Sequence, residues 1–513
     1  KAQADTDGQQ SWLSSTEVAA TRALVSGAGS LIPQRTHLRR SLAKLGGAST
    51  SPCVANVFGH SIVDGGYAND DVKSIDLAVE TIFEVSGFVG VLRRLFANRF
   101  GTVCGDAYMP AGSQNKRLAK AGGTTNTPGS SQGFGGSYTT IPANATPSTN
   151  TLTFAVNGTV CRVRGMIAAS GGQINYTVDG GATTAAAPAS TVQTPRVYGF
   201  YWLEVDLPLG ADGAHTVVIQ AHATASTIIF DVRGVSDITK GVLVGRYGFS
   251  GKCLPDMFAH ALDATDVAGP ASWLSSIATT GYFDQQLQSV IGRSNLPTYS
   301  LGAATMTIAS PAVVSFVGHK LNANDPVQFT TTGALPTGVT ASVNYYVMSS
   351  GLTADAFQIS ATPGGAAIVT TGAQSGVHTL IRVCKGFSTD LAIIMCDVND
   401  SSAGVAYGYS LADVQRHAQN VANKIVALGC DVLFVTGPRR QTWPASWTQD
   451  QNTAAYKAVA DATDHVGHLD LTPLWADWAD ANAAGLMVDY THLSSRGHAW
   501  DANAIYNALI AAM

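Results

Sequence analysis

Short apolar runs alternate with helix-like segments in the last third of the chain. The apolar runs cover residues 391–396, 431–436 and 468–471, and the segments with helical spacing cover 411–428, 452–465 and 495 onward. Strands that alternate with helices are typical of a parallel sheet, because a crossover helix returns the chain to the same end of the sheet. The pattern predicts a three-layer α/β/α domain.

Two other segments have the period-two alternation of half-buried strands. One contains strand-like stretches between turn-forming residues, at 152–156, 173–181, 202–207 and 215–220. It predicts a β-sandwich of jelly-roll type. The other has shorter stretches, at 313–316, 327–331, 345–348 and 356–360. It predicts a small β-module.

These changes of pattern set the expected domain boundaries. We expect an N-terminal helical attachment segment at 1–50 and one α/β domain split into three parts, at 51–118, 237–296 and 382–513. The two β-rich segments, at 119–236 and 297–381, are then insertions into that domain. Without them the α/β domain has roughly 250 residues, a normal size for one domain.

Two short motifs near opposite ends of the chain carry the candidate chemistry. Residues 59–65 read Gly-His-Ser-Ile-Val-Asp-Gly after an apolar run, so Ser61 is expected where a buried strand opens into a turn. Residues 489–492 read Asp-Tyr-Thr-His, and this spacing lets one turn present Asp489 and His492 together. A serine, an imidazole and a carboxylate are the nucleophile, base and base-orienting group of serine hydrolysis.

Each motif taken alone also has a structural interpretation. A serine at a strand end is usually a loop residue, and Ser61 lacks the Gly-x-Ser-x-Gly elbow of the α/β-hydrolases because Val63 replaces the last glycine. An isolated Asp–His pair is usually a polar surface loop. Two further segments lie between these motifs in the chain. Residues 247–251 read Tyr-Gly-Phe-Ser-Gly, and residues 397–400 read Asp-Val-Asn-Asp.

With these four ordered blocks, the chain resembles the SGNH, or GDSL-type, hydrolases. The resemblance implies that Ser61 is the nucleophile, His492 the base and Asp489 its orienting carboxylate. It also implies an oxyanion hole made by the backbone N–H groups of Ser61 and Gly251 and the side-chain amide of Asn399. Loss of one such donor typically costs about 3 kcal/mol of transition-state stabilisation. The structural alternatives are a tight turn at Gly251 and a strand-end cap at Asn399.

The chain departs from the family pattern at two positions. His60 stands where the first block of the family has aspartate, and Asp397 stands where the third block has glycine. Neither position has a role in the triad, so the prediction of activity is unchanged. Asp397 adds negative charge beside an anion-stabilising site unless it points away or pairs with Arg246 or Lys252.

Composition narrows the biological setting. Charged residues make up 13% of the chain, about half the usual share, which suits β-rich modules and extended assemblies. The formal net charge of -5 argues against nucleic acid as a partner. No apolar run reaches the roughly 18 residues needed to span a bilayer. The N-terminus has no signal-peptide core, so we expect a fragment or a processed form.

The seven cysteines, at 53, 104, 161, 253, 384, 396 and 430, have no metal-ligand spacing, and their odd number excludes complete intramolecular pairing. We expect buried free thiols, no metal and no organic cofactor.

The second insertion gives the best indication of context. Residues 325–368, with Gly-Ala-Leu-Pro-Thr-Gly at 333–338 and Thr-Pro-Gly-Gly at 362–365, resemble a small β-module of bacteriophage tail fibres. This implies a virion location in a phage tail, action at the bacterial surface, contacts with other tail proteins and a homo-oligomer such as a trimer. The first insertion resembles carbohydrate-binding modules in pattern, although a purely structural sandwich fits nearly as well.

Together these features predict a serine esterase, specifically an O-acetyl esterase (deacetylase) acting on bacterial capsule or O-antigen polysaccharide. One alternative is a lipase, thioesterase or aryl-esterase of the same fold, although no apolar lid helix flanks the catalytic blocks. Another is a receptor-binding adhesin with an inert hydrolase domain, which the changes at His60 and Asp397 favour. Four aromatic residues near the C-terminal motif are candidates for either sugar stacking or helix packing: Trp475, Trp478, Tyr490 and Trp500.

Overall fold

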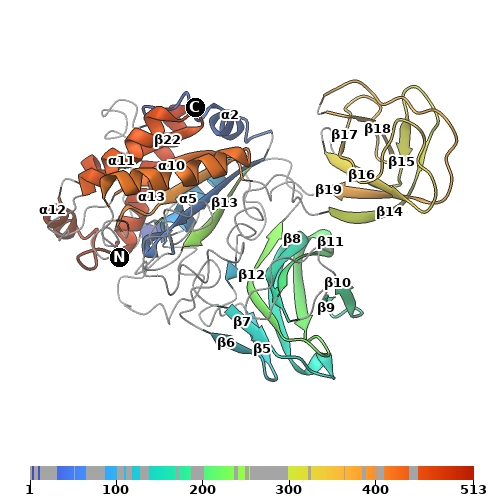
Figure 1. The fold of residues 1–513 in the computed structure, drawn as a ribbon, viewed down its shortest axis with the longest axis horizontal. Helices are drawn as coiled ribbons and strands as arrows, with labels where there is room; N and C mark the ends of the chain where they lie inside the picture. The colour runs from blue at the N-terminus through green and yellow to red at the C-terminus, as the bar shows by residue number, and fades with distance from the viewer. Residues whose placement is uncertain are drawn as a thin grey trace. The chain divides into compact units, whose positions relative to one another are not determined.

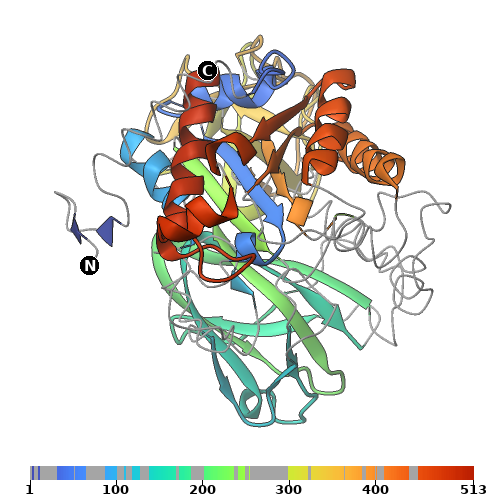
Figure 2. The same ribbon diagram turned by 90° about the vertical axis from the view of Figure 1, so that its left-hand side faces the viewer.

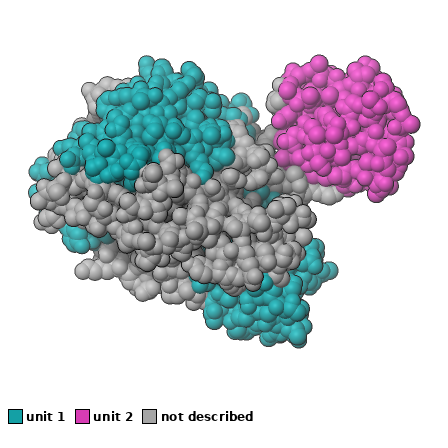
Figure 3. All heavy atoms as spheres, in the orientation of Figure 1, with its two compact units in different colours: residues 1–295, 388–513 teal, residues 296–387 magenta. Residues whose placement is uncertain are grey.

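The computed structural model describes two compact units, residues 1–295 with 388–513 and residues 296–387 (Figures 1 and 3). The described residues are 3–4, 10–11, 32–50, 52–64, 87–100, 109–110, 118–127, 138–168, 173–186, 201–235, 241–248, 254, 298–319, 321, 325–362, 364–383, 389–398, 400, 410–437, 449–475 and 477–513.

A five-stranded parallel sheet forms the centre of the first unit, which confirms the predicted α/β class. Its strand order is β13-β3-β20-β21-β22. The strands are β3 (Cys53–Gly59), β13 (Val242–Gly248), β20 (Leu391–Met395), β21 (Asp431–Thr436) and β22 (Val466–Asp470). Every residue of β3, β20 and β21 is buried, as expected for strands covered on both faces.

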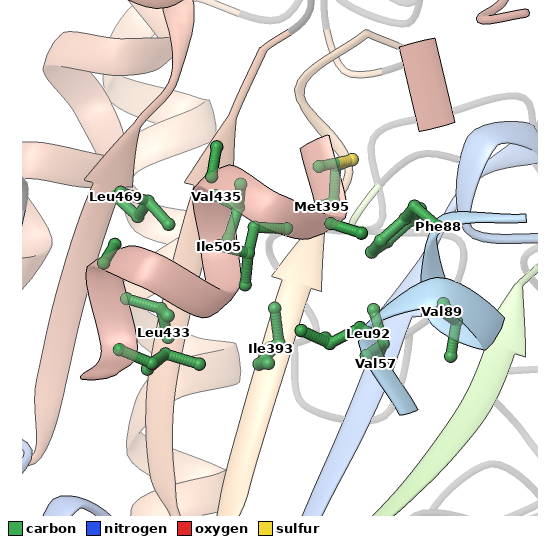
Figure 4. Close-up of a cluster of buried hydrophobic side chains, with 14 of the residues drawn as sticks. Val57, Phe88, Val89, Leu92, Ile393, Met395, Leu433, Val435, Leu469 and Ile505 are labelled. Carbon is green, nitrogen blue, oxygen red and sulfur yellow. The ribbon is translucent and has the colours of Figure 1, made fainter. Parts of the chain in front are cut away.

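Helices cover both faces of this sheet. On one face, α2 (Arg39–Gly46), α5 (Phe88–Phe100) and α13 (Ser495–Ala512) contribute to a core with alternate residues of the strands. Figure 4 shows Val57, Ile393 and Leu433 of this core beside Leu92 and Ile505. Figure 2 shows α5 and α13 side by side.

On the other face, α10 (Leu411–Ala427) and α11 (Gln449–Ala462) pack on the opposite set of strand residues, which includes Ile394 and Phe434. Successive side chains of a strand point to opposite faces of the sheet, so the same strands contribute residues to both cores. A capping box at Ser410 and Asp413 begins α10.

The order of the strands in the sheet determines where the candidate catalytic segments lie. After β3 the sheet continues on one side with β13 and on the other with β20. Ligands of open α/β sheets bind beyond the carboxyl ends of the strands at such a switch point. The segments that follow β3 and β20 therefore lie at the expected place for a site.

The inserted region before β13 is antiparallel. Its described strands join into one nine-stranded sheet of order β10-β9-β11-β8-β12-β7-β6, with β4 on β12 and β5 on β8. These strands are β4 (Met109–Pro110), β5 (Leu118–Ala121), β6 (Thr125–Thr127), β7 (Tyr138–Ile141), β8 (Thr151–Ile167), β9 (Ile174–Val178), β10 (Thr184–Ala186), β11 (Tyr201–Gln220) and β12 (Thr227–Val235).

This connected sheet differs from the two separate sheets expected of a jelly roll. The reason is that β8 and β11 pair along nearly their whole length, while β8 also carries β5 on its first half and β12 on its second. The sheet has its own core, which includes Phe154, Leu203 and Ile219.

The second unit is a closed barrel of order β14-β15-β18-β17-β16-β19. Its strands are β14 (Thr298–Met306), β15 (Val313–Ser315), β16 (Pro326–Thr331), β17 (Tyr345–Val347), β18 (Ala356–Ser360) and β19 (His378–Val383). Phe329, Phe357 and Leu380 are fully buried in it. The predicted small β-module is thus a barrel.

The remaining elements are short: β1 (Gln3–Ala4), β2 (Gln10–Ser11), α3 (Ser61–Asp64), a 3-10 turn at Pro147–Thr149, another at Thr472–Trp475 and α12 (Trp478–Ala483). In the N-terminal segment at 1–50, which was expected to be helical, the described helix is α2, and residues 12–31 lie outside the described part of the chain. Cys53, Cys161, Cys396 and Cys430 are buried in the cores. Among the described residues, no helix combines the length and apolarity needed to cross a bilayer.

Candidate active site

Ser61 lies at the carboxyl end of β3, where its backbone begins the short helix α3. The turn is tight, because a Cβ on Gly59 would lie 2.2 Å from the carbonyl oxygen of Met395 and 2.4 Å from Val63 Cγ2. The neighbouring N–H of His60 donates to that same carbonyl at 3.3 Å. Only glycine therefore allows β3 to approach β20 so closely just before the serine. The side chain of Ser61 lies outside the described part of the structure.

The second motif forms a compact loop between α12 and α13. Nδ1 of His492 lies 2.9 Å from Oδ2 of Asp489. Oδ1 of Asp489 accepts the backbone N–H groups of Thr491 and His492, at 2.7 and 2.6 Å. The carboxylate fixes the ring with Nδ1 toward it and Nε2 on the opposite side, which is the arrangement a base needs.

The hydrogen bonds of this loop also set the charge state of Asp489. Partial burial alone would raise the pKa of this carboxyl group. The bonds from the N–H and ring of His492 and from the N–H of Thr491 outweigh burial and lower the pKa below its ordinary value. Asp489 is therefore ionised at neutral pH and favours a proton on the adjacent ring nitrogen.

Neighbouring residues anchor the loop. Nε1 of Trp478 donates to the carbonyl oxygen of Asp489 at 3.1 Å, and the N–H of Val488 donates to the carbonyl of His492 at 3.0 Å. Oγ of Ser494 accepts the N–H of Gly497 at 3.1 Å, so this residue caps α13. The base is thus held at the start of a long buried helix.

The four aromatic residues near this motif differ in exposure. Trp475 is buried and donates Nε1–H to Asp501 at 3.0 Å. Trp478 and Trp500 are partly buried against the core. Tyr490, between Asp489 and His492 in sequence, is 54% exposed.

The two predicted oxyanion donors, Gly251 and Asn399, lie outside the described residues, but a hydrogen bond joins their neighbours. The N–H of Leu254 donates to Oδ1 of Asp400 at 2.6 Å. The hydroxyl group of Tyr456, in α11, donates to the other oxygen of Asp400. Leu254, three residues after the second block, is thereby tied to Asp400 of the third block and to α11. Sequence reasoning missed the roles of Asp400 and Tyr456.

Asp397 points into the domain. Its Oδ2 accepts hydrogen bonds from the N–H of Gly437 and from Nε2 of Gln449, both at 3.0 Å. Its backbone oxygen accepts from Nδ2 of Asn452 at 2.7 Å. Buried donors therefore balance the negative charge that the sequence places beside the candidate oxyanion site. No cluster of His, Cys, Asp or Glu side chains that could hold a metal ion occurs in the described ranges.

No family model matches the chain, and no curated protein sequence matches it. Among solved structures, the chain is similar to a peptidoglycan O-acetylesterase, with a TM-score of 0.47 and 10% identity over 93% of this chain and 95% of that one. A two-domain esterase active on acetylated mannans matches 25% of this chain and 36% of its own, with a TM-score of 0.20 and 14% identity.

An exo-β-1,3-galactanase from Phanerochaete chrysosporium matches 26% of this chain and 31% of its own, with a TM-score of 0.18 and 17% identity. All three TM-scores are below 0.5.

Proposed function

We propose that this protein is a serine esterase in which Ser61, His492 and Asp489 form the catalytic triad. The observation that carries the proposal is the 2.9 Å contact between His492 Nδ1 and Asp489 Oδ2, within a loop whose backbone also holds the carboxylate. The position of Ser61 at the carboxyl end of β3, beside the change in strand order, supports it.

The reaction proceeds through an acyl-enzyme. Oγ of Ser61 attacks the carbonyl carbon of the ester while Nε2 of His492 takes the hydroxyl proton, and Asp489 stabilises the imidazolium. Collapse of the tetrahedral intermediate breaks the bond to the alcohol oxygen, which leaves with the proton from His492. Water, deprotonated by His492, then attacks the acyl carbon. The bond from the acyl carbon to Oγ of Ser61 breaks as His492 returns the proton to Oγ, and the carboxylic acid leaves.

Charge on the intermediate needs donors that are already in place. We assign this role to the backbone N–H groups of Ser61 and Gly251 and to the side-chain amide of Asn399. The Leu254–Asp400 hydrogen bond supports the assignment because it links the segments that carry Gly251 and Asn399. Preorganised donors of this kind cost nothing to reorient during the reaction.

The substrate we propose is an O-acetyl group on a bacterial surface polysaccharide. In this proposal the protein belongs to a phage tail, acts outside the bacterial cell, contacts other tail proteins and forms a homo-oligomer. The exposed ring of Tyr490 beside the base is suited to stacking on a sugar. The fibre-like sequence at 325–368, which folds into the barrel, supports the tail location.

The experiment is acetate release from purified O-acetylated capsule or O-antigen. The wild type should release acetate, S61A should lower the rate by at least about a thousandfold, and S349A, at an exposed serine of the barrel, should match the wild type. Release that persists in S61A would contradict the triad.

Two other outcomes would indicate the alternative functions. Glycan binding without Ser61-dependent release would indicate an adhesin. Faster hydrolysis of long-chain nitrophenyl esters than of nitrophenyl acetate would indicate a lipase.

A further inference from the structure

The two positions at which the chain departs from the family pattern lie against each other. His60 follows β3, Asp397 follows β20, and these strands are neighbours in the sheet. Both side chains are fully buried, with 0% exposure, and Nε2 of His60 lies 3.8 Å from Oδ1 of Asp397. Two residues far apart in sequence therefore lie against each other, and one of them directly precedes the candidate nucleophile in the chain.

The hydrogen bond at the other ring nitrogen fixes the orientation of His60. Its Nδ1 accepts the N–H of Ile62, in α3, at 3.3 Å. An imidazole nitrogen that accepts a hydrogen bond carries no proton, so the proton of His60 is on Nε2. Among the described residues, neither Nε2 of His60 nor Oδ1 of Asp397 has a hydrogen-bond partner. Gly437 and Gln449 both donate to Oδ2 of Asp397. The N–H of the His60 ring is therefore directed toward the other carboxylate oxygen, Oδ1.

This arrangement makes the two changes depend on each other. A buried carboxylate is stabilised by donors and positive charge around it. Asp397 accepts two hydrogen bonds, from Gly437 just after β21 and from Gln449 at the start of α11, and its other oxygen lies 3.8 Å from the His60 ring, a polar contact longer than a hydrogen bond. An aspartate at position 60 would instead set a second carboxylate against Asp397, and two buried like charges repel.

We propose that His60 and Asp397 are a positioning pair that holds the backbone of Ser61 against the segment carrying Asn399. His60 connects α3, through Ile62, to the turn after β20. Neither residue touches substrate, and the role rests on the proposed esterase function. Because oxyanion donors act mainly on the transition state, loosening the pair lowers kcat and leaves KM nearly unchanged.

A double-mutant cycle tests this directly. We compare wild type, H60D, D397G and H60D/D397G with 4-nitrophenyl acetate as the probe. H60D should lower kcat about a hundredfold, as expected for a misplaced reacting group, with KM within about twofold. The double variant, which removes the repulsion, should recover at least about tenfold of that loss. A double variant whose kcat equals the product of the two single effects would overturn the pair.

Conservative substitutions keep the proposal testable if H60D does not fold. The amide of H60Q can still donate toward Asp397, whereas H60L cannot. H60Q should keep kcat within about tenfold of wild type, and H60L should fall by about a hundredfold with the same KM. Equal kcat values for H60Q and H60L would contradict the donor role of His60.

The stability of the same variants separates this inference from the esterase proposal. If the pair is real, the shift in urea midpoint of H60D/D397G is smaller than the sum of the single shifts, whatever the catalytic activity. Additive shifts would overturn the pair alone. A wild type without Ser61-dependent hydrolysis would overturn the proposed function and, with it, the positioning role.

Discussion

The carboxylate of Asp489 makes two hydrogen bonds with His492 and a third with Thr491, all within a single turn. It lies 2.9 Å from Nδ1 of the ring through Oδ2, and its Oδ1 accepts the N–H of His492 and that of the intervening Thr491. The orientation of the candidate base is therefore set by four consecutive residues and does not depend on a distant partner.

The first prediction concerns D489N. The side-chain oxygen of asparagine can still accept the two backbone N–H groups, but its NH2 group cannot accept the proton of His492 Nδ1. The imidazole then loses its orientation and its stabilising charge, and kcat for 4-nitrophenyl acetate should fall by about two to four orders of magnitude. D480N, at an exposed carboxylate in α12, is the matched control and should leave kcat unchanged. Equal activities of the two variants would contradict the role of Asp489.

The second prediction concerns Asp501, which is buried in α13. Burial raises its pKa to about 8, although the hydrogen bond from Trp475 acts in the opposite direction. Between pH 4 and pH 8 the folded protein keeps this proton while the unfolded chain has lost it, so this residue makes stability fall as pH rises. D501N removes that dependence and should gain on the order of a few kcal/mol relative to wild type between pH 5 and pH 8. Urea unfolding at the two pH values measures this, and identical pH dependence in both proteins would contradict it.

The third prediction concerns the cap of α13. Oγ of Ser494 accepts the N–H of Gly497 and donates to the carbonyl of Gly485 at 2.7 Å. S494A removes both bonds and should lower the free energy of unfolding by about 1 kcal/mol. Because the cap lies two residues after His492, kcat should also fall while KM stays constant. Chemical unfolding and steady-state kinetics on the same preparation check this, with S349A as the control.

The sequence predicted the strands β20 and β21 because a run of apolar residues marks each of them. The expected strand at 431–436 matches β21, and the expected one at 391–396 matches β20 to within one residue. Strands buried on both faces read as near-continuous apolar runs, and the polar residues Asp431 and Thr436 mark the two ends of β21. The Asp489–His492 pair was predictable for a related reason, since a separation of three residues restricts the geometry to one turn.

The contacts that tie the blocks together could not be predicted in this way. Asp400 and Leu254 are 146 positions apart, and Asp397 and Gln449 are 52 apart. These contacts form because of the order of the strands in the sheet. The spacing of apolar residues within one segment gives no information about that order. The same applies to the single nine-stranded sheet, because the full-length pairing of β8 with β11 is a property of two strands together.

The fourth prediction concerns Tyr247, at the end of β13. Nη1 of the buried Arg233, in β12, donates to its hydroxyl group at 3.2 Å, and its ring stacks on Phe58 with centroids 5.0 Å apart. Y247F keeps the stacking but removes an acceptor from a buried cation. The free energy of unfolding should fall by about 1–3 kcal/mol. Y346F, in the barrel, is the control, and equal unfolding midpoints for the two variants would contradict the contribution of this bond.

Covalent labelling of Ser61 tests the central claim most directly. Intact protein is treated with a fluorophosphonate, which reacts with a serine only when an adjacent base activates it, and the modified peptide is identified by mass spectrometry. We predict one adduct per chain, on Ser61, that is abolished in S61A and strongly slowed in H492A and D489N. A folded wild-type protein that stays unlabelled at Ser61, or that is labelled equally in H492A, would contradict the catalytic triad.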